Sequence, residues 1–536
     1  MSVETIELVA AERPRAEALA AALAPELAVR AQDPVTLERV YLDTFDGLLH
    51  AQALTLSWEQ GRFELAGAIA GGAAAADADA DADADERPRL VAAGAGPSGP
   101  LPGAELPAGA LRDAVTELTE VRALLPRARL RVTVEAIAIL DELDKTVARI
   151  VIELPELVAG GAGGRVALRP RLRLLGVRGY GRELELARSR FVAALALDQA
   201  GESLFDEAVS AAGERPEGVS SKLDVAIAPG ERAGAAVASV LRRLLEIIDA
   251  NLPGTLSDTD SEFLHDYRVG VRRTRAVQRE FKRVFPPDAL ARLRAEFKWL
   301  QQVTGDSRDL DVYVLGFESM RALVPESAQA DLDPLLGLLE ARRLAARRAM
   351  RRELRSDRAT ALRRDWGELL VRLGDLDGLD ASDGLDAGLP IGKVASERIR
   401  KVYHRMVRMG TAIEPSSPPE AYHELRKQGK ELRYLLELFG APLHDPDVVK
   451  PMIKVLKGLQ DVLGHHQDRE VQMTTLRGLR DDVAALPGGP GALMAMGVLV
   501  ERLEHDAATA RAEFADAFST FAGKRQRARV EATFAA

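Results

Sequence analysis

Two stretches of this 536-residue chain repeat the same pattern of residues at a nearly constant distance. His265 and Arg268 are followed by further basic residues, and His423 and Arg426 are followed by them in the same way, 158 residues later. Downstream, GDSRDLDV from residue 305 and GHHQDREV from residue 464 match at an offset of 159. Two copies of one unit usually pack about a pseudo-twofold axis, because the face that buries one copy suits the other. The repeat therefore predicts two related bodies in the second half of the chain.

The repeated region has helical periodicity. Its apolar residues recur at 3.6-residue spacing, in segments separated by Pro, Gly or Asp. We predict an all-α domain over residues 225–528, with its two copies at about 230–375 and 390–525. Within the second copy, Gly464 is expected to end one helix near residue 463, and Asp468 to cap the next.

The first half of the chain has the pattern of a sheet. Runs such as VYLDTF, LTLSWEQ and LRVTVEAIAIL alternate apolar and polar residues. They predict an α+β domain with an antiparallel, tunnel-like sheet at residues 1–205. A strict Ala/Asp alternation and a Gly/Pro-rich stretch predict a disordered insert near residues 71–112, since neither offers large side chains to bury. Residues 206–224 are predicted to be a linker.

Composition excludes several classes of protein. The chain has no cysteine, which rules out disulfide frameworks, thiolate zinc sites and cysteine nucleophiles. It shows neither a basic start followed by an apolar run nor a membrane-spanning apolar stretch, so we expect a cytoplasmic protein with no membrane partner. A net charge of -10 disfavours non-specific nucleic-acid binding by the chain as a whole.

Against that acidic background, residues 265–283 carry seven Arg or Lys and two acids. On a helix, His265, Arg268, Arg272, Arg275 and Arg279 would share one face, and the second copy repeats this stripe. Stacked like charges cost roughly a few tenths of a kcal/mol per pair unless an anion compensates them. Because the planar guanidinium of arginine binds phosphate oxygens through paired hydrogen bonds, the stripes predict a ligand with many phosphates.

Together, the two His-x-x-Arg helices and their downstream Gly-x-x-(Arg/Gln)-Asp segments resemble the CHAD domain, the histidine-bearing α-helical domain. The resemblance covers about residues 225–525. It implies two related bundles, a basic cavity and binding of inorganic polyphosphate without turnover, and it leads us to expect no cofactor, metal or catalytic residue. The predicted polyphosphate contacts are His265, Arg268, Arg272, Arg273, Arg275, Arg279, Lys298, Arg308, Arg347, Arg351, His423, Arg426, Lys427, Lys430, Arg433 and Lys457.

The first half resembles the CYTH, or triphosphate-tunnel, fold through residues 40–60, 145–154 and 174–185. Enzymes of that kind need a starting Glu-x-Glu-x-Lys to hold a divalent metal and phosphate. This chain reads Thr5-Ile6-Glu7-Leu8-Val9, and its strand at residues 54–60 lacks the expected arginines. We therefore expect a degenerate domain without hydrolysis. A reduced anion site at Arg129, Arg131, Glu135, Lys145 and Arg149 is weighed against solvated strand faces, which we favour.

The sequence thus predicts a non-catalytic polyphosphate-binding accessory protein, acting in the cytoplasm at polyphosphate granules, with granule proteins as candidate partners. One alternative is a CYTH-type, metal-dependent triphosphatase that uses the helical domain as a substrate tether. A second is a nucleic-acid-binding module using the same basic stripes. Few aromatic residues accompany those stripes to stack on bases, which disfavours nucleic acid.

Overall fold

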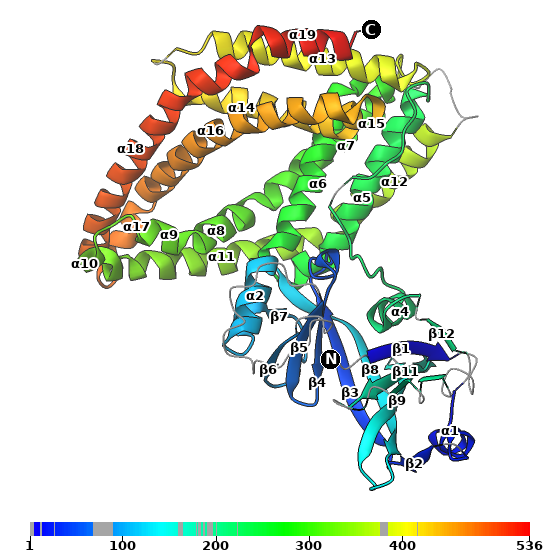
Figure 1. Cartoon of the computed structure of the whole chain (residues 1–536). Coiled ribbons are helices and arrows are strands. Elements are labelled where there is room, and N and C mark those ends of the chain that lie inside the picture. Colours follow the sequence, from blue (N-terminus) through cyan, green and yellow to red (C-terminus); the bar gives the residue numbers. More distant parts are fainter. Residues whose placement is uncertain are drawn as a thin grey trace. The chain divides into compact units, whose positions relative to one another are not determined.

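The chain forms two compact units, Met1–Ser220 and Ser221–Ala536 (Figure 1). The structure, a computed structural model, describes residues 5–10, 13–25, 27–67, 89–158, 164–177, 180, 184–185, 188–189, 197–199, 201–221, 223–375, 384–414 and 416–535. The Ala/Asp part of the predicted insert, residues 71–88, lies outside these ranges. The predicted order of an antiparallel sheet domain followed by an all-helical domain is confirmed.

The first unit is built on an antiparallel sheet. The strands follow the order β12-β1-β11-β9-β8-β3-β4-β5-β6, with β10 paired to β9, and β2 and β7 paired to β8. The long hairpin of β8 and β9 lies at its centre, because their alternating Val, Ile and Leu residues bury one face. The strands are β1 Thr5–Ala10, β2 Ala28–Ala31, β3 Val35–Asp43, β4 Leu54–Glu59, β5 Arg62–Gly67, β6 Arg89–Ala93, β7 Leu101–Pro102, β8 Ala123–Leu140, β9 Thr146–Val158, β10 Arg165–Ala167, β11 Arg171–Gly176 and β12 Leu197–Gln199.

Part of the predicted disordered insert is ordered, so its extent of 71–112 is wrong from residue 89 onward. There β6 pairs with β5, with Leu90 opposite Leu65. The helix α2 Ala110–Thr119 then buries Leu111 and Val115. Treating the whole stretch as one low-complexity segment obscured these apolar residues, which supply the packing that the Ala/Asp run lacks.

The predicted linker also contains a helix. The helix α4 Leu204–Ala211 starts with a capping box, in which the Ser203 side chain accepts from the Asp206 backbone and Asp206 accepts from the Ser203 backbone. Its Leu204 and Phe205 pack against the sheet beside Tyr41. The first unit therefore extends past residue 205, since this helix belongs to its core. The remaining helix of the unit is α1 Ala16–Leu23.

The second unit is built of helices joined by loops in its described residues, 221, 223–375, 384–414 and 416–535. Its helices are α5 Ala233–Ser257, α6 Ser261–Glu280, α7 Pro287–Val303, α8 Gly305–Leu315, α9 Phe317–Arg321, α10 Glu326–Gln329, α11 Asp333–Leu354, α12 Asp357–Gly374, α13 Ile391–Thr411, α14 Pro419–Leu435, α15 Ala441–Leu443, α16 Pro446–Gly478, α17 Arg480–Ala484, α18 Gly489–Phe521 and α19 Lys524–Thr533. A π-helical turn, Leu436–Gly440, joins α14 to α15.

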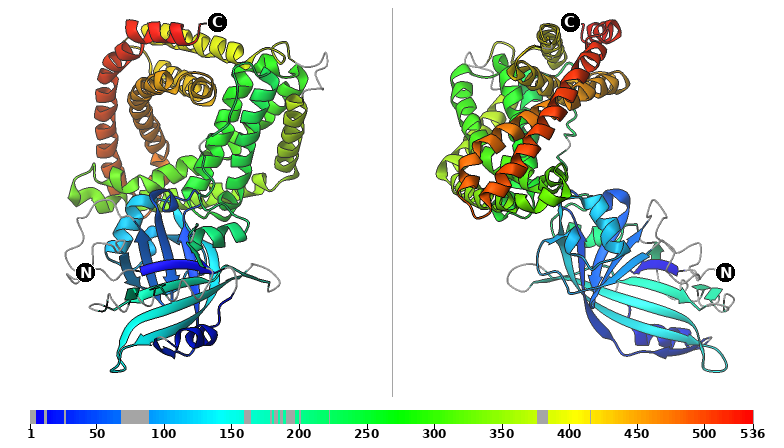
Figure 2. Two further views of the ribbon diagram at one scale, coloured as in Figure 1. Left: turned by 45° about the vertical axis from the view of Figure 1, so that its right-hand side comes forward. Right: turned by 90° about the vertical axis from the view of Figure 1, so that its left-hand side faces the viewer.

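The two copies pack their helices in the same order. α5 packs on α6 and α6 on α7, as α13 packs on α14 and α14 on α16. The two basic helices, α6 and α14, also contact each other. The long helices α16 and α18 run side by side, as both views in Figure 2 show. One large apolar core, with Trp366, Phe281 and Phe439 fully buried, joins helices of both copies.

The second copy differs from the sequence prediction at Gly464. α16 runs without interruption from Pro446 to Gly478, so the expected break between residues 463 and 467 is wrong. Gly464 is not among the residues with positive φ, and Asp468 lies inside the helix rather than at its start. In the first copy the chain does break, at Thr304, between α7 and α8. A helix interior tolerates a glycine at a cost of about 1 kcal/mol, which is too little to end a helix whose flanks are packed.

Candidate anion-binding site

A cavity of about 590 Å³ opens between the basic helices of the two copies. We call it the central cavity. Its walls come from α6, α7 and α14, and its polar lining holds seven cationic and two anionic side chains. These are Arg272, Arg275, Arg279, Arg294, Lys298, Lys427 and Lys430, with Glu424 and Glu431. The excess of positive charge is confined to one concave surface, which is the arrangement that concentrates anions.

Four of these cations make no hydrogen bond or ion pair with any described residue. They are Arg272 on α6, Arg294 and Lys298 on α7, and Lys430 on α14. Arg272 is half-buried, and its Nε is buried without a partner. An unpaired buried donor carries a desolvation penalty of about 1 to 3 kcal/mol, and more when charged. These side chains are therefore available to an anion, and an anion would relieve their cost.

Lys430 links the central cavity to a second one. The second cavity, of about 320 Å³, lies between α14 and α16 and is lined by Arg426, Lys430, Arg433, Gln460, Asp461, Gly464, His465 and Asp468. Burial, together with the charges of Arg426 and Arg272, lowers the pKa of Lys430 to about 8. Arg272 belongs to the first copy and Arg426 to the second. The two basic stripes, one from each copy, thus meet at Lys430.

The remaining cations of the central cavity have protein partners. Arg279 pairs with the buried Glu431 and lies 3.7 Å from a carboxylate oxygen of Glu280. Arg275 donates to the side-chain oxygen of Gln301, and Lys427 donates to Glu424 over 2.7 Å. Burial lowers the pKa of Arg279, with Glu280 acting against it and Arg275 acting with it. These contacts orient the guanidinium groups without neutralising the cavity.

Arg268 and Arg426 explain the repeated Gly and Asp residues. Arg268 donates to the Gln301 carbonyl over 2.9 Å and to Thr304 Oγ1 over 2.8 Å. Burial lowers its pKa to about 10, although Asp309 acts to raise it. A Cβ on Gly305 would lie 3.8 Å from the guanidinium of Arg268. Arg268 is thus mainly a structural residue that holds α6 to the α7–α8 junction.

The second copy repeats this arrangement with small changes. A Cβ on Gly464 would lie 3.5 Å from the guanidinium of Arg426, which donates to Asp468 over 3.2 Å. Each copy therefore places its His-x-x-Arg arginine over a glycine of the facing helix and beside an aspartate four residues further on. Arg426 differs from Arg268 in being less buried and in lining a cavity.

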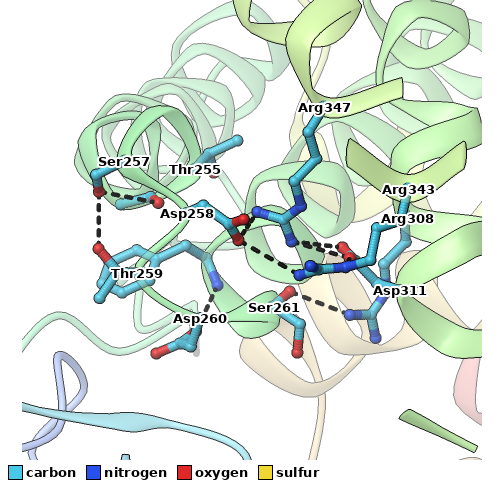
Figure 3. A network of polar contacts seen from close by, with 12 residues as sticks. Thr255, Ser257, Asp258, Thr259, Asp260, Ser261, Arg308, Asp311, Arg343 and Arg347 are labelled. Atoms are coloured by element: carbon cyan, nitrogen blue, oxygen red, sulfur yellow. Dashed lines mark hydrogen bonds and ion pairs between the residues drawn. The ribbon is translucent and has the colours of Figure 1, made fainter. Parts of the chain in front are cut away.

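Arg347 and Arg308, predicted as ligand contacts, belong instead to a network of ion pairs (Figure 3). Arg347 is buried and donates to Asp311 over 2.9 and 3.0 Å, and it also pairs with Asp258. Arg308 donates to the Ser261 carbonyl over 3.0 Å, at the start of α6. Burial and neighbouring Arg351 lower the pKa of Arg347 to about 10. The network ties α11 and α8 to the α5–α6 junction. The helical spacing of Arg343 and Arg347 on α11 therefore reflects packing between helices and not a ligand site.

Five further predicted contacts line neither cavity. Arg273 is bound to the Ser221 carbonyl and to Glu437. His423 Nδ1 lies 2.8 Å from Gln467 Oε1, and His265 is half-buried on α6. Arg351 on α11 and the exposed Lys457 on α16 lie outside both linings. Of the predicted set, the structure brings together Arg272, Arg275, Arg279, Lys298, Lys427 and Lys430 in the central cavity, and Arg426, Lys430 and Arg433 in the second.

Sequence reasoning missed Arg294. It precedes Lys298 by four residues, so both lie on one face of α7 and reach the same cavity. Only Lys298 has a counterpart in the second copy, which is why the repeat alone passed over Arg294. The i, i+4 spacing on a helix that follows the basic stripe was the signal available.

The first unit has a cavity of its own, of about 460 Å³, lined mainly by strands β3 to β6, β9 and β11. Most of its charges are paired with one another: Arg39 donates to Glu59 over 2.6 Å and to Glu153 over 3.1 Å, and Arg173 also pairs with Glu153. Burial acts to raise the pKa of Glu153, but the charges of Arg39 and Arg173 hold it below its ordinary value. The candidate anion site of Arg129, Arg131, Glu135, Lys145 and Arg149 does not line this cavity.

No metal site or membrane segment was found in the part of the chain that the structure describes. Within it, no group of three or more His, Asp or Glu residues is arranged to hold a metal ion. No helix there is both long enough and apolar enough to cross a bilayer.

The fold and site define a class of protein: a helical domain of two repeated bundles whose basic helices face one cavity. Residues 239–477 match the family model of the CHAD domain, so the chain contains a CHAD domain, as its motifs predict. The crystal structure of the CHAD domain from the plant Ricinus communis is similar at 23% identity, covering 55% of this chain and 94% of that one, with a TM-score of 0.47. PptA from Streptomyces chartreusis is similar at 17% identity, covering 54% and 100%, with a TM-score of 0.41. No curated protein matches the chain.

Proposed function

We propose that the central cavity and the second cavity together bind inorganic polyphosphate, without turnover. The observation that carries this proposal is the meeting of four unpaired cations, Arg272, Arg294, Lys298 and Lys430, at one concave surface built from both copies. A flexible chain of phosphates supplies a negative charge at every unit, which suits cations spread over two connected cavities. The CHAD domain family supports the same ligand class.

Binding is largely electrostatic in this proposal. Each phosphate neutralised by an Arg or Lys releases condensed counterions, so affinity falls steeply as salt rises. The planar guanidinium groups of the cavity arginines can each bind two phosphate oxygens through paired hydrogen bonds, which a lysine cannot do. The cellular role that follows is that of an accessory protein at polyphosphate granules.

The decisive experiment is a titration of long-chain polyphosphate into the full-length protein at two salt concentrations. The test variant changes Arg272, Lys298 and Lys430 to Gln, because none of them makes a hydrogen bond or ion pair with described residues, and its fold should survive. The matched control changes Arg477, Arg480 and Arg502 to Gln; their side chains are 58%, 71% and 59% exposed and line neither cavity. Both variants lose three positive charges.

We expect the cavity variant to lose affinity by about 100-fold, with a shallower dependence on log salt by about two to three units, while the control stays close to wild type. Equal losses in both variants would mean that polyphosphate follows net charge and not the cavity, and the proposal would fail. Single-stranded RNA in a competition arm separates the nucleic-acid alternative: it should displace polyphosphate poorly.

The first unit belongs to the proposal as a non-catalytic domain. Each carboxylate that lines its cavity is paired with an arginine: Glu59 and Glu153 with Arg39, and Glu64 with Arg89, which leaves no free pair of carboxylates for a metal among them. The test is phosphate release from tripolyphosphate with added Mg²⁺ or Mn²⁺. Release above the rate of an Arg39→Gln, Glu153→Gln variant would establish the triphosphatase alternative.

A further inference from the structure

Lys430 differs in three ways from the other lysines of the central cavity. It is half-buried, whereas Lys298 and Lys427 are exposed. It has no partner among the described residues, whereas Lys427 is bound to Glu424. Finally, it lines both cavities, so it is reached from two sides. A primary amine that is accessible, unpaired and surrounded by other cations is a candidate nucleophile.

Arginines surround this amine from both copies. Arg272 approaches from α6, Arg426 and Arg433 lie on α14 itself, and His465, Asp461 and Asp468 face the second cavity from α16. Arg426 pairs with Asp468, and Arg433 lies 3.6 Å from a carboxylate oxygen of Glu437. Over the two cavities together six guanidinium groups face four carboxylates, so a small phosphate-bearing molecule would be held with its phosphate against the arginines. Whatever electrophilic atom is bonded to that phosphate then lies close to the Lys430 amine.

We propose that Lys430 is a covalent acylation site, modified by small acyl phosphates that bind with their phosphate on Arg272, Arg426 and Arg433. In the reaction the unprotonated Nζ attacks the acyl carbon, and the bond from that carbon to the phosphate oxygen breaks. The amine loses one proton, which ends on the departing inorganic phosphate, and an amide remains. No oxidant, metal or further reactant takes part.

The amine is poised for this step because its pKa of about 8 leaves roughly a quarter of it unprotonated at pH 7.5, against about one part in a thousand for an ordinary lysine. The same neighbours that lower the pKa would bind the phosphate. Acylation removes the charge of the one residue common to both cavities, so it would switch off anion binding. That consequence rests on the proposed function, whereas the modification itself does not.

The test incubates the full-length protein with acetyl phosphate from pH 6.5 to 9 and follows acetylation of each lysine by peptide mass spectrometry. Lys457, exposed on the same unit and outside both cavities, is the internal control. We expect the initial rate at Lys430 to exceed that at Lys457 by at least about tenfold at pH 7.5, and to level off above pH 8. His465→Gln should leave this midpoint in place. Equal rates at Lys430 and Lys457 overturn the proposal.

A second reagent separates nucleophilicity from phosphate recognition. An acetyl N-hydroxysuccinimide ester carries no phosphate, so the ratio of Lys430 to Lys457 labelling should be higher with acetyl phosphate than with the ester. If both reagents gave the same ratio, the arginines would not be binding the phosphate of the reagent. The assignment of acyl phosphates as the modifying molecules would then be wrong.

The polyphosphate titration tests the proposed function separately from the acylation of Lys430. Selective acetylation of Lys430 in a protein that does not bind polyphosphate would leave this inference standing and remove the proposed function. Polyphosphate binding together with an unreactive Lys430 would do the reverse. If both hold, Lys430→Gln should weaken binding like acetylation, Lys430→Arg should preserve it, and bound polyphosphate should protect Lys430 from acetyl phosphate.

Discussion

Individual arginines of the helical unit play two roles that helical spacing does not distinguish. Arg268 and Arg347 are buried and bonded to the protein, whereas Arg272 and Arg294 have no partner among the described residues. Both kinds recur at i, i+3 or i+4. The difference lies in the residues opposite: a carbonyl and Thr304 face Arg268, and Asp311 faces Arg347. Whether a charge is structural or free for a ligand is therefore decided by its partners.

The ion-pair network around Arg347 predicts a large stability effect. Asp311→Ala should lower the free energy of unfolding by about 3 to 5 kcal/mol, because it leaves the buried guanidinium of Arg347 with one carboxylate instead of two. Urea denaturation measures this loss. The exposed Asp481, bound only to Arg480, is the control, and Asp481→Ala should change stability by less than about 0.5 kcal/mol. A similar small change at Asp311 would contradict a structural role for Arg347.

At Lys430 we expect a mutation to have the opposite effect, a rise in the free energy of unfolding. Its lowered pKa means that the folded state carries its charge at a cost, and that the unfolded state binds more protons between about pH 8 and 10.4. The cost is fully present below pH 8 and disappears as pH rises through 10.4. Lys430→Met should therefore raise the free energy of unfolding by about 1 to 2 kcal/mol at pH 7, and by little at pH 10.5.

The same Lys430→Met variant should bind polyphosphate more weakly at pH 7. A gain in stability together with a loss of binding identifies a residue kept for its ligand. If denaturation and titration instead show Lys430→Met destabilised at pH 7, the charge is compensated within the protein and the cavity is not poised for an anion.

Among the elements, α16 shows how the two copies diverged. The first copy turns at Thr304, and the second continues through Gly464 as one helix of 33 residues. The repeat in the sequence persists across this difference because each copy keeps its arginine against the glycine and near the aspartate. The matching spacing of these residues in the two copies therefore reflects a contact between helices. It does not indicate a turn in the second copy.

This continuity predicts that Gly464→Ala stabilises the protein. The new Cβ would lie 3.5 Å from Arg426, an ordinary contact, and alanine gains roughly 0.5 to 1 kcal/mol over glycine in a helix. Gly458, with open space around it, should behave alike, whereas Gly410→Ala would place a Cβ 2.0 Å from the Phe518 ring and destabilise. Thermal unfolding of the three variants checks this. Destabilisation at Gly464 alone would favour the helix end that the sequence predicted there.

For the whole molecule, charge is divided between the units. Residues 221–536 hold 49 Lys and Arg against 47 Asp and Glu, so the net acidity of the chain comes from residues 1–220. The helical unit is nearly neutral in total, yet its central cavity gathers seven cations and two anions. The net charge of a unit therefore says little about the charge of the ligand that it binds.

Because the two units have separate hydrophobic cores, we expect the helical unit to fold and to bind polyphosphate without the first unit. Its cores contain no residue of the first unit, so a chain of residues 221–536 should fold cooperatively. It should bind polyphosphate within about threefold of the full-length affinity, because the cavities lie wholly within it. Denaturation and titration of this fragment measure both expectations. A loss of binding in a folded fragment would assign part of the site to residues 1–220.

The sequence by itself determined the helical domain, its two copies, and the two basic helices that bear five of the seven cations of the central cavity. Periodicity and repetition are local or pairwise properties of the chain, and they survive without coordinates. The resemblance of the first half to a triphosphate tunnel stays a prediction, and there the structure adds an antiparallel sheet with a cavity whose carboxylates are paired with arginines.

Only the tertiary structure decided which cations are free. Arg268 belongs to the same stripe as Arg272, and Arg308 and Arg347 were predicted contacts on other helices. Carbonyls or carboxylates from other helices bind these three, whereas none of the described residues binds Arg272. Convergence at Lys430 likewise depends on the packing of α6 against α14. Partners that lie about 30 to 160 residues apart in the sequence meet only when the helices pack, so no local pattern encodes them.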